Sequence, residues 1–338
     1  MGAGVLGLAS AEALLRAGAE VTILEQGTVA QESSWAGGGI LSPLSPWDYP
    51  DVVTQLTTRG ASLFGAWAES LERETGIDPE YWRCGMMVSP PLGLQTAQSW
   101  CESHAVRFEL IEGGLFLPEV AQVRNPRLLQ ALRAAVMKLG GRIIEHCAVK
   151  EINVDKVSAR SVTTSRGEFS SDNYVVTAGA WTKQLLGENA LQLGIKPIRG
   201  QMLLFKFDSP PLPHVVLQAG LYLIPRRDGH LLVGSTLEDV GFDKSTTVEA
   251  GDSLLQRASK ILPVLENMPV IKHWAGLRPG SPDNIPTIGR HPNLENLYIN
   301  SGHFRYGVTM APASVEVLLN EINGLPQMLD VTPYRWGL

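Results

Sequence analysis

Three glycines near the start of the chain have the spacing of a phosphate-binding turn. Gly2, Gly4 and Gly7 form a Gly-x-Gly-x-x-Gly segment, which precedes an alanine- and leucine-rich run and then an apolar stretch that ends on Glu25. Such glycines allow a tight turn, close approach of a pyrophosphate and packing of a helix on a strand. The helix N-terminus then faces the phosphates, and the acidic residue accepts hydrogen bonds from a ribose. This order predicts dinucleotide binding, with an ordinary glycine-rich turn as the alternative.

Three further segments combine glycine with serine, arginine and aromatic side chains. They are Ser33–Gly39 (Ser-Ser-Trp-Ala-Gly-Gly-Gly), Gly276–Gly280 (Gly-Leu-Arg-Pro-Gly) and Gly302–Gly307 (Gly-His-Phe-Arg-Tyr-Gly). The last one places a glycine-flanked loop directly ahead of an expected helix. The N-terminus of that helix would stabilise the anionic reduced ring of a flavin. The glycine fingerprint alone does not separate NAD from FAD, but this loop favours FAD.

With these motifs the chain resembles the D-amino acid oxidase superfamily, most closely the glycine oxidases of thiamine thiazole synthesis. The resemblance runs from end to end, apart from the first strand. None of the three cysteines lies in the 33–39 loop or in the 302–307 segment, so we expect noncovalent FAD. The resemblance implies that the cofactor contacts Gly2, Gly4, Val5, Leu6 and Gly7 at the pyrophosphate, Glu25 and Gln26 at the ribose, Val149 at the adenine, Ser33, Ser34, Gly38, Gly39 and Ile40 along the flavin, and His303, Phe304, Arg305, Tyr306, Gly307, Val308 and Thr309 around its ring.

The same resemblance implies three substrate-binding residues. Arg278 matches an arginine that pairs with the substrate carboxylate, Tyr222 a tyrosine that shares this carboxylate, and Arg305 a second arginine. A bidentate pair of arginine and carboxylate is strong and oriented, which suits an amino acid substrate. Without the resemblance, each residue has an alternative interpretation: Arg278 as a surface charge, Arg305 as a loop cap and Tyr222 as a core aromatic of the sheet. The sequence shows no evident catalytic His or Glu pair, and we name no general base.

The reaction implied is FAD-dependent oxidative deamination of glycine, sarcosine and small D-amino acids. The products are the oxo acid, ammonia and hydrogen peroxide, and glycine imine would supply the thiazole ring of thiamine. One alternative is a D-amino acid dehydrogenase or a sarcosine oxidase-like enzyme, and another is a flavin enzyme that acts on a modified tRNA base. A third alternative, from another class, is a flavin-free binding protein.

The pattern of elements predicts an α/β fold in two interleaved regions. We expect a Rossmann-like FAD-binding domain of the D-amino acid oxidase type in residues 1–48, 120–190 and 276–338. A mainly antiparallel, β-rich substrate domain should comprise residues 49–119 and 191–275. Only Met1 precedes the first glycine, so the first Rossmann strand is expected to be missing. A truncation, a misassigned start or another segment in that sheet position would each explain this.

Charge and cysteine content exclude several classes of function. The 338 residues contain 28 basic and 34 acidic side chains, a net charge of −6, which does not favour nucleic acid or an anionic membrane as partner. No window approaches 18 uninterrupted apolar residues, and we expect a cytoplasmic protein without a membrane partner. Cys84, Cys101 and Cys147 are scattered without a Cys-x-x-Cys motif, so we expect no disulfide and no metal site. The expected partners are a small amino acid and oxygen, and a homo-oligomer stays open.

Overall fold

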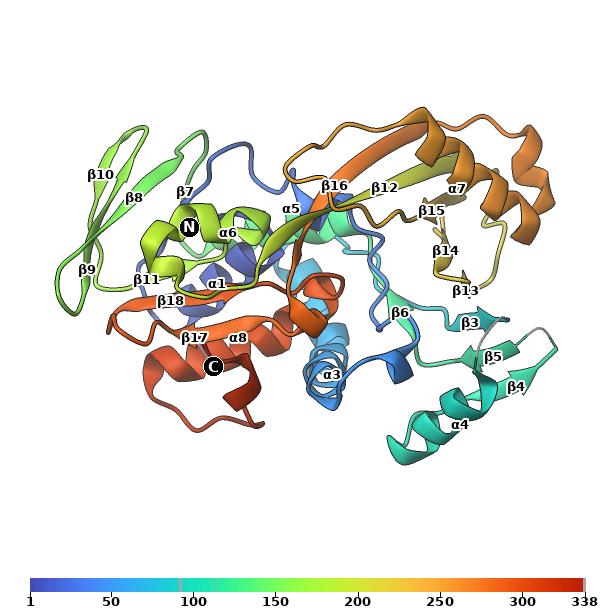
Figure 1. The fold of residues 1–338 in the computed structure, drawn as a ribbon, viewed down its shortest axis with the longest axis horizontal. Coiled ribbons are helices and arrows are strands. Elements are labelled where there is room, and N and C mark those ends of the chain that lie inside the picture. The colour runs from blue at the N-terminus through green and yellow to red at the C-terminus, as the bar shows by residue number, and fades with distance from the viewer. Residues whose placement is uncertain (91–92, 113, 337–338) are drawn as a thin grey trace.

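Two regions, each assembled from separate stretches of the chain, lie side by side in the computed structural model (Figure 1), which describes residues 1–90, 93–112 and 114–336. The first contains short parallel strands and the helices α1 (Val5–Arg16), α5 (Asn125–Lys138) and α8 (Gly307–Asn323). The second contains an eight-stranded sheet. This is the α/β architecture expected from the sequence.

Parallel strands form the centre of the first region. β1 (Thr22–Leu24) pairs with β7 (Arg142–Ile144), and β11 (Tyr174–Val176) pairs with β18 (Leu297–Ser301), both in parallel. β17 (Thr287–Arg290) runs antiparallel to β18. Between the two pairs, the Gly2 amide donates to the Leu24 carbonyl at 2.8 Å, and the Thr177 amide donates to the Met1 carbonyl at 2.9 Å. Met1 and Gly2 therefore occupy the sheet position of the first strand, the strand that we expect from the sequence to be missing.

Helices cover this region and place the start of α8 beside the site. α3 (Asp51–Thr75) packs along α8, and α1 lies between α5 and α8. Phe64, Leu128 and Leu132 are fully buried in the core that these helices share. The two helix backbones lie close together where Gly60 faces Thr309, since a Cβ at position 60 would be 2.1 Å from the Thr309 carbonyl oxygen. A small residue in α3 thus fixes the position of the first turn of α8.

The second region is a sheet in the order β16-β12-β15-β14-β13-β3-β5-β4. Its strands are β3 (Met86–Ser89), β4 (Glu109–Ile111), β5 (Gly114–Leu117), β12 (Lys196–Lys206), β13 (Val215–Gln218), β14 (Leu221–Pro225), β15 (His230–Gly234) and β16 (Lys272–Gly280). All neighbours are antiparallel except β13 and β3. α7 (Val248–Ile261) packs on the apolar face that includes Phe205 and Leu223, and α4 (Leu94–Ser103) packs near β3 and β5. The boundary placed between residues 275 and 276 lies inside β16, so this strand is shared by both stretches.

The remaining elements are short connections. β8 (Val149–Val154), β9 (Ala159–Thr164) and β10 (Gly167–Phe169) form a small antiparallel sheet, and β2 (Trp82–Arg83) pairs with β6 (Ala121–Gln122). The short helices are α2 (Ser33–Ala36) and α6 (Thr182–Leu186), with 3-10 turns at 46–48, 179–181, 187–190, 263–267, 282–284 and 332–334. Within the described ranges, no helix is both long and apolar enough to cross a bilayer.

Candidate active site

A long cavity runs between the two regions and collects the residues singled out from the sequence. Twenty-one of the 22 predicted cofactor and substrate residues line it, and Gly7 is the exception. A Cβ on Gly7 would overlap the carbonyl oxygen of Gly2, so this glycine allows the turn to close and does not contact the cavity. Sequence motifs that lie hundreds of residues apart are therefore brought to one site.

One end of the cavity is formed by the glycine turn and the start of α1. Gly2 has φ +104°, and a Cβ there would lie 2.5 Å from the Thr177 carbonyl oxygen, so only glycine fits. Gly4 is the N-cap residue of α1, and the first turn of the helix contains no acidic residue. The Val5 amide donates to Ser34 Oγ at 3.0 Å. The helix N-terminus thus presents amide groups to the cavity, which suits the pyrophosphate of a dinucleotide.

Glu25 lies at the same end and is fixed by two backbone amides. Its carboxylate accepts hydrogen bonds from the Ala3 amide at 2.7 Å and the Gly27 amide at 2.9 Å. The carboxylate is 8% exposed and joins the end of β1 to the glycine turn. Cys147, a buried thiol that the sequence did not mark as a site residue, lines the cavity together with Val149. This end has the composition of an adenosine pocket.

The 33–40 loop is held in place by side chains from three other elements. Asn125 of α5 donates from Nδ2 to the Ser34 carbonyl at 2.7 Å, and Trp274 of β16 donates from Nε1 to the Ala36 carbonyl at 3.1 Å. Arg226, which follows β14, donates from Nη2 to the Gly38 carbonyl at 2.7 Å. These three residues were not identified from the sequence. An Asn at a helix start and an Arg directly after an apolar strand were the only available indications.

Arg226 is a buried cation. It is 3% exposed and also donates from Nη1 to Gln122 Oε1 at 2.6 Å and to the Val123 carbonyl at 2.8 Å. Burial lowers the pKa of Arg226 to about 10, so it stays charged at neutral pH. A charged side chain therefore lies beneath the loop that borders the middle of the cavity.

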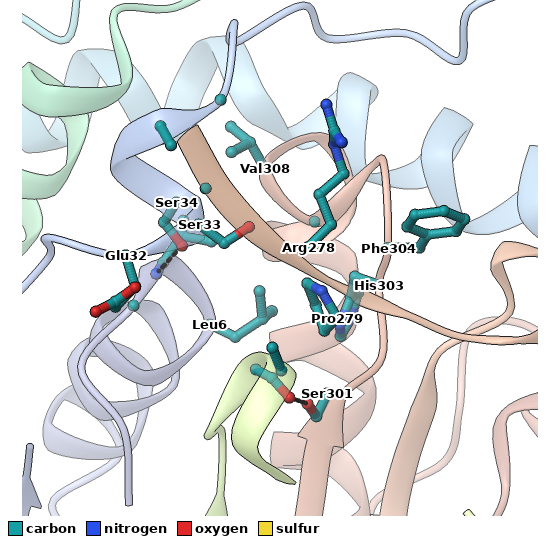
Figure 2. Close-up of a pocket in the computed structure, with 18 of the residues that line it drawn as sticks. Leu6, Glu32, Ser33, Ser34, Arg278, Pro279, Ser301, His303, Phe304 and Val308 are labelled. Carbon is teal, nitrogen blue, oxygen red and sulfur yellow. Dashed lines mark hydrogen bonds between the residues drawn. The ribbon is translucent and has the colours of Figure 1, made fainter. Parts of the chain in front are cut away.

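The 302–309 segment turns sharply before it enters α8. Gly302 and Phe304 have positive φ angles of +82° and +41°, and the Phe304 amide donates to the Pro279 carbonyl at 3.0 Å. His303 is 1% exposed, and its Nε2 makes a 2.8 Å hydrogen bond with Ser314 Oγ. Burial lowers the pKa of His303 to about 3, so its imidazole is neutral. Figure 2 shows His303, Phe304 and Val308 grouped around Pro279 and Arg278 of β16.

Arg278 is the main cationic group in this part of the cavity. Its Nη2 donates to Ser235 Oγ at 2.5 Å and its Nη1 donates to the Thr236 carbonyl at 3.2 Å. Burial lowers the pKa of Arg278, the nearby Tyr222 raises it, and the charge of Arg305 lowers it again. Among the described residues, no carboxylate lies within ion-pair distance of Arg278. The three residues proposed from the sequence to bind substrate therefore meet in the cavity, and the described part of the chain provides the Arg278 guanidinium with no counter-ion.

Three alternate residues of β16 contribute to the site from one face of the strand. Trp274 holds the 33–40 loop, Gly276 lets α2 approach because a Cβ there would lie 2.5 Å from the Ala36 methyl group, and Arg278 lines the cavity. Alternate residues of a strand share a face. One strand therefore sets the spacing between the 33–40 loop and Arg278.

Known proteins share this sequence and fold. A family model described as FAD dependent oxidoreductase (DAO) matches residues 1–320. The glycine oxidase of Pseudomonas aeruginosa is 40% identical in an alignment 351 residues long, which includes 99% of this chain and 96% of that protein. The bifunctional protein ThiO/ThiG of Synechocystis is 32% identical over 94% of this chain and 50% of its own length. The crystal structure of glycine oxidase from Geobacillus kaustophilus matches with a TM-score of 0.93 and 25% identity, covering 99% of this chain and 96% of that chain.

These similarities agree with the chemistry of the cavity. The glycine turn and the helix N-termini suit a flavin dinucleotide, and Arg278, which has no ion-pair partner among the described residues, suits an amino acid. The family and the FAD cofactor expected from the sequence are confirmed. The chain belongs to the DAO family of FAD-dependent oxidoreductases and is an FAD-dependent amino acid oxidase.

Proposed function

We propose that the protein oxidises glycine, and with it sarcosine and small D-amino acids, using oxygen as the electron acceptor. With glycine, one oxygen and one water molecule are consumed, and glyoxylate, ammonia and hydrogen peroxide are formed. The observation that supports this most directly is the half-buried Arg278 guanidinium, which faces the cavity without an ion-pair partner among the described residues. A substrate carboxylate would provide the missing charge.

The residues of the cavity fit noncovalent FAD. Glu25, Gln26 and Val149 would hold the adenosine, the start of α1 the pyrophosphate, and the 33–40 loop with the 303–309 segment the flavin. When bound, FAD supplies the two-electron acceptor for the carbon–nitrogen bond of the amine. The N-terminus of the 17-residue helix α8, which is the positive end of its dipole, lines the cavity next to the 303–309 segment and favours negative charge there.

Arg278, Tyr222 and Arg305 would orient the substrate. The guanidinium of Arg278 holds the carboxylate, the Tyr222 hydroxyl shares it, and Arg305 adds positive charge to the pocket. Orientation and electrostatics contribute most of the catalysis in such a site. His303 does not serve as a base, because its Nε2 is engaged by Ser314. We propose no other base in the pocket and expect the substrate amine to be oxidised in its neutral form.

Peroxide release across a panel of amines tests the proposal. We expect turnover of glycine, sarcosine and D-alanine, no turnover of L-alanine, and a kcat/KM for glycine above that for D-phenylalanine. Each methylene in a closely fitting pocket is worth roughly 1 kcal/mol, so the ratio reports the size of the pocket. A ratio well below one would replace glycine by larger D-amino acids. Activity with a dye acceptor but without oxygen consumption would indicate the dehydrogenase alternative.

The state of the flavin is tested separately. We expect acid or heat to release all FAD from a yellow preparation, since no cysteine occurs in the 33–40 or 302–309 segments. Colour that stays with the denatured protein would show a covalent bond. A colourless protein that takes up no FAD would return the flavin-free binding protein to consideration.

We further propose that the imine formed from glycine supplies the thiazole ring of thiamine. The similarity to the ThiO/ThiG protein, of which this chain matches half the length, supports this placement. A host that lacks its own imine-forming enzyme and requires thiazole should grow without it when it expresses this protein. Rescue by an Arg278→Ala variant that releases no peroxide would contradict the proposal.

A further inference from the structure

The route of the Arg278 side chain across the sheet assigns a function to two residues outside the glycine-containing segments 2–7, 33–39, 276–280 and 302–307. We propose that Ser235 and Gly200 are positioning residues for the substrate. Ser235 orients the guanidinium of Arg278, and Gly200 leaves open the space that this guanidinium occupies. The inference rests on the proposed function in one respect, that Arg278 binds the substrate carboxylate.

Strand order explains why both residues are needed. β12 lies between β16, which carries Arg278, and β15, after which Ser235 follows. Arg278 is paired with Ile198 of β12, and its side chain crosses this strand to reach Ser235 Oγ at 2.5 Å and the Thr236 carbonyl at 3.2 Å. The Arg278 side chain thus extends across the full width of β12 before its guanidinium reaches the two acceptors, Ser235 and Thr236.

Gly200 is the residue over which the guanidinium lies. A Cβ at position 200 would come closer than 3.0 Å to Nη1, Nη2 and Cζ of Arg278, three of the four heavy atoms of the guanidinium. Gly200 has no positive φ angle, so its backbone conformation would accept alanine. The requirement for glycine at this position therefore comes from the Arg278 side chain and not from the backbone.

The acceptors are held rigidly on β12. The amide of Arg199 donates to the Glu238 carbonyl at 2.8 Å, and the amide of Glu238 donates back to the Arg199 carbonyl at 3.0 Å. The side chains of this pair also meet, with Arg199 Nη2 at 2.6 Å from Glu238 Oε2 and the arginine 4% exposed. The Gln201 amide donates to Thr236 Oγ1 at 2.8 Å. Thr236 is therefore tied to β12 on both sides of its position, and Ser235 directly precedes it in the chain.

This arrangement orients the donors that a carboxylate requires. A guanidinium has five N–H donors, of which Ser235 and Thr236 each accept one. Three donors remain for a carboxylate, on a guanidinium that lines the cavity and is already held by its other two bonds. A group that is already oriented loses less conformational freedom on binding, so affinity for the carboxylate increases. Ser235 acts through Arg278 and contributes to substrate binding more than to the chemical step.

Ser235→Ala in the FAD-loaded protein tests the role of the hydroxyl. Acetate, which has the carboxylate without an amine, and acetamide, its uncharged analogue, are titrated by the change in flavin absorbance. We expect the Kd for acetate and the KM for glycine to rise about tenfold, with kcat changed by less than about twofold. The Kd for acetamide should stay unchanged. Ser209→Ala, in an exposed loop outside the cavity, is the matched control.

Gly200→Ala tests the space. The added methyl group displaces the guanidinium, so we expect a larger loss of acetate affinity than in Ser235→Ala while FAD stays bound. Gly65→Ala is the control, because its Cβ would meet Tyr81 at an ordinary 3.7 Å. Wild-type values of acetate Kd and glycine KM in Ser235→Ala would overturn the proposal, even if Gly200→Ala failed to fold. Acetate binding that depends on Ser235 in a protein that does not oxidise glycine would retain the inference and reject the proposed function.

Discussion

Arg226 Nη2 and the carbonyl oxygen of Gly38 are joined by a 2.7 Å hydrogen bond, which connects a buried cation to the loop that borders the flavin position. The same guanidinium also donates hydrogen bonds to the Gln122 side chain and to the Val123 carbonyl. Its bonds thus join the end of β14, the end of β6 and the 33–40 loop. The path of this loop depends on a residue outside every cofactor motif.

Replacement of Arg226 by Met should loosen the flavin loop. The change leaves the carbonyl groups of Gly38 and Val123 without their buried donor, which typically costs about 1–3 kcal/mol for each group. We expect weaker FAD binding and a lower Tm, measured by flavin fluorescence and by calorimetry. Arg227→Met is the control, because Arg227 is exposed and its guanidinium carbon lies 5.5 Å from the ring centre of Trp82. Equal FAD affinity in the two variants would contradict this role of Arg226.

Arg278→Lys should separate charge from geometry at the substrate end. Lysine keeps the positive charge but cannot form a bidentate pair or reach Ser235 in the same way. We expect the KM for glycine to rise at least about thirtyfold, which corresponds to about 2 kcal/mol, with a nearly unchanged flavin spectrum. Steady-state kinetics show the change. A KM like that of the wild type would remove Arg278 from the site.

His303 should make stability depend on pH in the acid range. Burial lowers its pKa from the ordinary 6.5 to about 3 in the folded state. Between these values the unfolded chain binds a proton that the folded chain does not, so stability falls as pH falls from 6.5 to 3. At pH 5 the loss is about 2 kcal/mol.

The His303→Asn variant measures this contribution. Its side chain does not titrate, so urea unfolding at pH 5 and pH 7.5 should show a smaller acid loss than in the wild type. His146→Asn is the control, because His146 is exposed and has φ +53°, which asparagine tolerates. Identical pH slopes in wild type and His303→Asn would show that His303 titrates normally.

Gly60→Ala should separate α3 from α8. The added Cβ would overlap the Thr309 carbonyl, and relief of such overpacking typically costs about 1–3 kcal/mol. Because Thr309 Oγ1 also donates to the Ile40 carbonyl at 3.1 Å, we expect FAD affinity to fall together with Tm. Gly65→Ala in the same helix makes only an ordinary contact with Tyr81 and should leave both unchanged. If Gly60→Ala and Gly65→Ala have the same Tm and the same FAD affinity, α3 and α8 can move apart without loss of stability, and the prediction is wrong.

The sequence was sufficient for residues whose role depends on the local backbone. Gly2 and Gly302 have positive φ angles, and they lie in contiguous motifs that retain their pattern in the linear chain. Arg226 and Asn125 could not be found in this way, because their partners lie 188 and 91 residues away. The role of Gly200 depends on which strands flank β12, and sheet order is not contained in any local pattern. Met1 and Gly2 occupy a sheet position through backbone bonds that side-chain patterns do not reveal.

Trp274 and Arg278 lie four residues apart on one face of β16, which makes this strand a spacer of fixed length between the 33–40 loop and the proposed carboxylate-binding group. At about 3.3 Å per residue, the two side chains start about 13 Å apart along the strand. Nine paired residues join β16 to β12, so the register of β16 cannot shift unless the whole ladder of hydrogen bonds is broken. With Arg278 in the proposed role, selection for a new amine must act on the walls of the pocket, since the distance from the 33–40 loop to Arg278 is inherited with the sheet. Directed evolution of this enzyme should accumulate changes at lining side chains and leave the register of β16 intact.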